Sequence, residues 1–174
     1  MPAISNKVSS INESSSIKLA STITNLRSEG KDIIGLNVGE PDFMPQSICL
    51  EATKKAIDEG KYRYSKVQGE APLITALFDY HQSLSTTPLK KENFLVSNGS
   101  KQSLYQVFQT ICNPGDEVII FAPYWVTFPE SIKLAGATPI TISGDTETLI
   151  PSFEAVLEKI TENSIFPVTV EPKI

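Results

Sequence analysis

The chain has 174 residues, of which 40% are hydrophobic and 20% charged, a composition typical of a globular domain with its own core. The net charge of -5 and the pI of about 4.9 argue against nucleic acid or an anionic membrane as the main partner. No apolar run approaches the roughly 20 residues that cross a bilayer. The segment Met1–Ser16 has no apolar signal core, so we expect a cytoplasmic protein.

The cysteines and the histidine give no metal-binding pattern. Cys49 and Cys112 lie far apart and match no ligand spacing, and His81 is the only histidine. We therefore expect no metal site. Both thiols are expected to be buried as small hydrophobic side chains in a reducing compartment.

The N-terminal part begins with a serine-rich segment, residues 9–16, which is predicted to be an arm or the lead-in to a helix. Apolar residues at helical spacing over 17–26 predict a helix that ends at Gly30. Residues 32–38 are predicted to form a short strand, followed by a turn over 39–43.

Helices and strands follow one another in the rest of the chain. The predicted elements are helices over 47–59 and 72–84, a strand over 93–97, a helix over 100–112, a strand over 117–121, a helix over 124–135 that ends at Gly136, a strand over 138–142 and a helix over 152–160 with Ser152 as its N-cap. From Asn93 onward the alternation indicates an α/β domain with a largely parallel, covered sheet. In such sheets ligands bind at the carboxyl ends of the strands.

The start of the helix at Gly99 is suited to bind a phosphate group. The first N–H groups of a helix have no partners within it and carry partial positive charge. Gly99 allows a ligand to approach the backbone, Ser100 adds a hydroxyl donor and Lys101 adds a charge. The alternative is an ordinary strand–helix turn in which Gly99 satisfies a backbone angle. Neither the nucleotide P-loop pattern nor the dinucleotide glycine pattern is present.

Four motifs occur in a fixed order, and together they carry a family resemblance. They are NVGEPDF (37–43), GKYRYSKVQG (60–69), VSNGSKQSLYQVFQTICNPGDEVII (96–120) and APYWVTFPESIKLAGATPI (122–140). Over about residues 4–163 the chain resembles the N-terminal portion of class I pyridoxal-phosphate aminotransferases, especially bacterial aspartate and aromatic-type enzymes. The resemblance implies an incomplete fold-type I transferase. Its parts would be an N-terminal arm and small-domain segment (1–46), the first half of the large cofactor-binding domain (47–164) and an aberrant tail (165–174).

The resemblance also implies a cofactor, a reaction and site residues. Pyridoxal 5'-phosphate would serve transamination between an amino acid of aspartate or aromatic type and a 2-oxo acid, in a cytoplasmic homodimer. Site residues would be Gly99, Ser100 and Lys101 at the cofactor phosphate, Trp125 stacked on the pyridine ring, Tyr64 reaching the phosphate of the other subunit, and Gly39 with its backbone against the substrate carboxylate. The alternatives are a core or interface role for Trp125, a surface or interface role for Tyr64 and a simple turn at Gly39.

The chain departs from the family pattern near its end. Neither the NPTG motif nor the Schiff-base lysine that follows it in the family is present, and Lys101, beside the expected phosphate, is too far from the cofactor aldehyde to replace that lysine. After Ser164 the sequence reads IFPVTVEPKI, and Pro167 and Pro172 disfavour a central buried strand. We therefore expect a truncated form that is inactive alone. The alternatives are a non-catalytic remnant with at most weak phosphate or cofactor binding, and an unrelated nucleotide-binding α/β protein.

Overall fold

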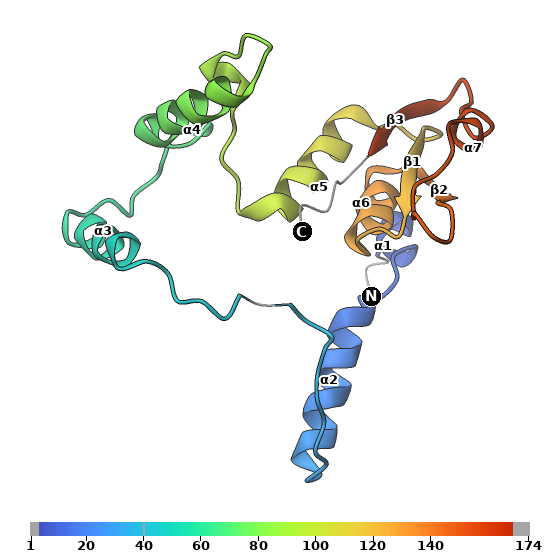
Figure 1. Ribbon diagram of the computed structural model, residues 1–174, viewed down its shortest axis with the longest axis horizontal. Coiled ribbons are helices and arrows are strands. Elements are labelled where there is room, and N and C mark those ends of the chain that lie inside the picture. The colour runs from blue at the N-terminus through green and yellow to red at the C-terminus, as the bar shows by residue number, and fades with distance from the viewer. Residues whose placement is uncertain (1–3, 40, 169–174) are drawn as a thin grey trace. The chain divides into compact units, whose positions relative to one another are not determined.

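The computed structural model describes residues 4–39 and 41–168. The chain divides into two compact units (Figure 1). The first unit joins Met1–Val38 to Gly99–Ile174, and the second is Gly39–Asn98.

A parallel sheet of three strands forms the centre of the first unit, in the order β2-β1-β3. The strands are β1 (Glu117–Ala122), β2 (Thr138–Ser143) and β3 (Ser164–Val168). Glu117 lies opposite Thr138 in β2 and opposite Ser164 in β3. Three consecutive residues of β1, 118–120, are buried. Because successive side chains of a strand point to opposite faces, both faces of β1 are covered.

The helices of the first unit are α1 (Asn6–Ser9), α2 (Ser15–Ser28), α5 (Gly99–Ile111), α6 (Thr127–Ala135) and α7 (Phe153–Leu157). Of these, α5 and α6 supply the hydrophobic core together with β1. The core cluster consists of Phe108, Val118, Ile120, Phe128, Ile132, Ala135 and Ala137. A parallel sheet covered by helices is the predicted α/β arrangement.

Two predicted helix ends are confirmed in detail. Gly136 follows α6 with a φ of 89°, in the left-handed region that favours glycine. The Ser152 hydroxyl accepts a hydrogen bond of 3.1 Å from the N–H of Ala155 and caps α7.

The second unit contains α3 (Ser47–Asp58), α4 (Ala71–Leu84) and a short 3-10 helix, η1 (Lys91–Asn93). Both predicted helices are confirmed. Within the described part of this unit, Ile74 is the one buried residue. The unit therefore has very little core of its own.

The strands predicted over 32–38 and 93–97 are wrong: neither segment belongs to a sheet of the described residues, and Asn93 is the last residue of η1. Their backbone groups form hydrogen bonds with individual side chains or with isolated backbone groups instead. The Arg27 guanidinium donates to the Ile33 carbonyl at 2.9 Å, and the Gln68 side-chain amide donates to the Phe94 carbonyl at the same distance. A strand pattern gives a strand only where a partner strand is available.

Two further expectations differ from the structure. Cys49 is exposed on α3 rather than buried, whereas Cys112 is half-buried. The strand β3, which is not among the elements predicted from the sequence, runs through Pro167. β3 lies at one edge of the described sheet, where proline is tolerated because an edge strand has one unpaired side. Pro172 lies outside the described residues.

No helix in the described ranges is long and apolar enough to cross a membrane.

Candidate functional site

The first part of the site is the start of α5. Gly99 has a φ of 77°, a conformation that side chains other than glycine adopt with strain. A Cβ atom added there would meet no atom within 4 Å, so the space beside the helix start is open. Ser100 and Lys101 are exposed next to it. The thirteen residues of α5 make its N-terminus a region of partial positive charge.

The second part is Trp125, which lies between the end of β1 and the start of α6. Its carbonyl accepts a hydrogen bond of 2.9 Å from the N–H of Phe128. The two rings meet edge to face, with 6.0 Å between their centroids. Phe128 is buried, whereas Trp125 is 43% exposed. The indole is therefore anchored on the core and still accessible, which is not the pattern of a core residue.

These two parts meet. The Lys101 ammonium lies 5.2 Å from the centroid of the Trp125 ring. Lys101 belongs to the first turn of α5, and Trp125 follows the carboxyl end of β1, where ligands bind in parallel sheets. The structure therefore brings four of the predicted site residues, Gly99, Ser100, Lys101 and Trp125, into one region.

The two other predicted site residues, Tyr64 and Gly39, belong to the second unit. The Tyr64 side chain is fully exposed. A Cβ atom added at Gly39 would also meet no atom within 4 Å. Their roles toward a cofactor or a substrate stay predictions.

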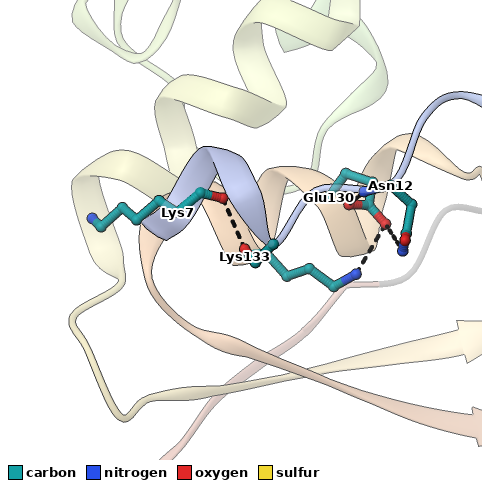
Figure 2. A network of polar contacts seen from close by, with 5 residues as sticks. Lys7, Asn12, Glu130 and Lys133 are labelled. Carbon is teal, nitrogen blue, oxygen red and sulfur yellow. Dashed lines mark hydrogen bonds and ion pairs between the residues drawn. The ribbon is translucent and has the colours of Figure 1, made fainter. Parts of the chain in front are cut away.

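Sequence reasoning missed a polar network on α6, centred on Glu130 (Figure 2). The Asn12 backbone N–H donates to the Glu130 Oε2 at 3.0 Å, and the Asn12 Nδ2 donates to the Oε1 at 3.3 Å. The Lys133 Nζ lies 3.0 Å from the same Oε1. Asn12 and Glu130 are 118 positions apart, so no local pattern links them.

The network lowers the pKa of Glu130. Partial burial acts to raise the pKa of this carboxyl, but the hydrogen bonds donated by Asn12 and Lys133 outweigh it. Glu130 is therefore ionised in the folded chain over a wider pH range than an ordinary glutamate.

No group of three or more histidine, cysteine, aspartate or glutamate side chains in the described residues could hold a metal ion.

Comparison with known proteins identifies a family and several relatives. The family model described as aminotransferase class I and II matches residues 31–171. The chain is 36% identical over 165 residues to a probable aspartate/prephenate aminotransferase of Thermus aquaticus, covering 92% of the chain and 42% of the relative. It is 38% identical over 151 residues to an aspartate/prephenate aminotransferase of Cereibacter sphaeroides, covering 85% and 37%.

Solved structures give the same result. An aspartate aminotransferase of Thermus thermophilus with maleate matches at a TM-score of 0.87 and 32% identity, over 94% of this chain and 43% of that one. An aspartate aminotransferase of Rhizobium meliloti also matches at 0.87, with 28% identity, over 93% and 41%. The likeness confirms the predicted fold class. The chain spans about two-fifths of the length of these relatives.

Proposed function

Because this chain belongs to the aminotransferase class I and II family, we propose that it forms the part of a transaminase that holds the phosphate and the ring of pyridoxal phosphate. The complete enzyme transfers an amino group between an amino acid of aspartate or aromatic type and a 2-oxo acid. The observation that carries the proposal is the meeting of Lys101, at the start of α5, with the accessible ring of Trp125.

The residues present fit the cofactor. A phosphate needs positive charge and hydrogen-bond donors, and the start of α5 offers the helix dipole, the Ser100 hydroxyl and the Lys101 ammonium. It also needs room, and the space beside Gly99 is open. A pyridine ring needs a flat apolar surface, which the exposed part of Trp125 provides.

The proposed roles follow from these properties. Ser100 donates a hydrogen bond to a phosphate oxygen, and Lys101 supplies an opposing charge. Trp125 orients the ring by stacking and excludes water from the face that it covers, an interaction of roughly 1 kcal/mol. Pyridoxal phosphate, when bound, supplies the electron sink that this chemistry requires.

Tyr64 and Gly39 complete the proposed site in a homodimer. The phenol of Tyr64 reaches the cofactor phosphate held by the other subunit, and its full exposure leaves it available for such a contact. The backbone of Gly39 lies against the substrate carboxylate. In this scheme residues 1–46 are the arm and small-domain segment, residues 47–164 are the first half of the large domain, and residues 165–174 are the aberrant tail.

We assign the Schiff-base role to no lysine among the 174 residues. Lys101 belongs to the phosphate end of the proposed site, because it lies in the first turn of α5. The NPTG motif and the lysine after it are also not part of this sequence. In this proposal, the lysine that reacts with the cofactor aldehyde is not among the 174 residues.

An amino-transfer assay tests the proposal. The 174-residue chain, given pyridoxal phosphate, aspartate and 2-oxoglutarate, should show no turnover. A product translated through and beyond the codon for Ile174 should show turnover if that extension supplies NPTG and the lysine. Turnover by the chain alone would refute the lysine assignment, and an inactive extended product carrying both features would refute the function. Displacement of bound pyridoxal phosphate by equimolar ATP would favour the nucleotide-binding alternative instead.

A further inference from the structure

The N-terminal segment, residues 5–12, lies along α6 and reaches both of its ends (Figure 2). At the first turn of α6, Asn12 contacts Glu130 through two hydrogen bonds. At the far end, a Cβ atom added at Gly136 would lie 3.4 Å from the Lys7 Nζ, so the Lys7 side chain covers the terminus of the helix. A cation at a helix C-terminus is favourable, because the last carbonyls carry partial negative charge.

The Glu130–Lys133 ion pair is better shielded from water than the other ion pairs of the described residues. The side chains of Glu130 and Lys133 are 22% and 27% exposed. Those of the three other pairs are between 39% and 76% exposed. Shielding strengthens the Lys133 contact, and Glu130 also receives two exposed, charge-assisted hydrogen bonds from Asn12.

Glu130 is also close in the chain to the accessible indole. Phe128, on the same first turn of α6, donates its N–H to the Trp125 carbonyl and packs its ring against the indole. The first turn of α6 therefore contacts Trp125 through both its backbone and the Phe128 ring, and Trp125 in turn meets Lys101.

We propose that Asn12 and Glu130 are positioning residues for Trp125. The N-terminal segment acts as a strap that fixes the first turn of α6 and thereby the ring orientation at the cofactor site. The expected effect on ligand binding rests on the proposed function. The expected effect on the orientation of the Trp125 ring does not.

The experiment uses the single tryptophan of the chain as its reporter. Asn12→Asp replaces the amide donor by a carboxylate that faces Glu130. The swap Asn12→Asp with Glu130→Gln restores a donor–acceptor pair, now with the roles exchanged. We expect Asn12→Asp to shift the Trp125 emission to the red and to raise acrylamide quenching about twofold, and the swap to restore both, since the two sites are directly coupled.

Ser152→Ala serves as the control for a general loss of stability. It removes the Ser152 hydroxyl that caps α7, without touching α6. It should lower the unfolding free energy and leave the Trp125 emission of the folded chain unchanged. Should Asn12→Asp leave emission and quenching unchanged, or should Ser152→Ala change them equally, the strap would be refuted.

A ligand titration separates this inference from the proposed function. The probe is 4-deoxypyridoxine 5'-phosphate, which has no aldehyde and so cannot react with surface lysines. We expect Asn12→Asp to weaken its binding about fivefold and the swap to restore it, as for two directly coupled residues. If the fluorescence changes appear but the unsubstituted chain does not bind the probe, the positioning of Trp125 by the N-terminal segment is supported and the proposed cofactor site is refuted. If the unsubstituted chain binds the probe and Asn12→Asp changes neither the Trp125 fluorescence nor the probe affinity, only the positioning role of the N-terminal segment is refuted.

Discussion

The Lys101 ammonium lies 5.2 Å from the centroid of the Trp125 ring, so a cation covers part of the only tryptophan in the chain. Such a contact at an exposed site contributes about 0.5–1 kcal/mol. A phosphate at the start of α5 would attract the same ammonium more strongly, because that interaction joins two full charges. Lys101 therefore links the two halves of the proposed site.

Lys101→Met tests this link. It keeps most of the hydrocarbon chain against Trp125 and removes the charge. We expect the affinity for 4-deoxypyridoxine 5'-phosphate to fall about tenfold, the equivalent of losing one charge-assisted hydrogen bond. The affinity for unphosphorylated 4-deoxypyridoxine should not fall. Equal losses for both ligands, measured by Trp125 fluorescence, would mean that Lys101 does not act on the phosphate.

Gly99 offers a comparison between two substitutions of the same shape. Both Gly99→Asn and Gly99→Asp place a side chain that tolerates positive φ into open space, so their effects on folding should be similar. Only aspartate adds a negative charge at the proposed phosphate position. We expect Gly99→Asp to abolish binding of the phosphorylated probe in isothermal titration calorimetry and Gly99→Asn to retain part of it. Full affinity in Gly99→Asp would exclude a phosphate at this helix start.

The Glu130 network predicts a pH dependence of stability. The pKa of Glu130 is lowered in the folded chain, so its contribution is present above the unfolded value of about 4.3 and is lost as the pH falls through the lower folded value. Glu130→Gln should therefore lower the unfolding free energy at pH 7 by about 1 kcal/mol and by much less near pH 3. Urea unfolding at both pH values measures the difference. A loss that is the same at pH 7 and near pH 3 would argue against the ionised carboxylate as its source.

The distribution of buried residues predicts uneven hydrogen exchange. β1 is buried on both faces over residues 118–120, whereas the described part of the second unit has Ile74 as its one buried residue. Slow exchange requires a stable core around the amide. In the isolated chain we expect the slowest amides in β1 and rapid exchange over residues 41–98, read by mass spectrometry. Equal protection of α4 and β1 would contradict this expectation.

The elements that could be predicted are those whose signals are local. Gly136 and Ser152 end and start helices through their own backbone and side chain, and both were predicted correctly. The strands predicted over 32–38 and 93–97 do not form, because a strand also depends on a distant partner that the local pattern does not reveal. β3 was missed for the related reason that proline is acceptable at an edge.

The same distinction applies to the site. The helix start at Gly99 could be proposed as an anion site from three consecutive residues, Gly99, Ser100 and Lys101. The contact between Lys101 and Trp125, and the bonds between Asn12 and Glu130, join segments far apart in the sequence. They follow from how α5, α6 and the N-terminal segment pack, which no single motif encodes.

The most direct test of the proposed site is a Trp125 fluorescence titration of the 174-residue chain with 4-deoxypyridoxine 5'-phosphate and with its unphosphorylated form. If the start of α5 holds the phosphate and Trp125 stacks on the ring, the phosphorylated ligand should quench the fluorescence saturably. It should also bind at least tenfold more tightly than the unphosphorylated form, the difference that a single charge-assisted contact supplies. Equal affinities, or no saturable change with either ligand, would contradict the site.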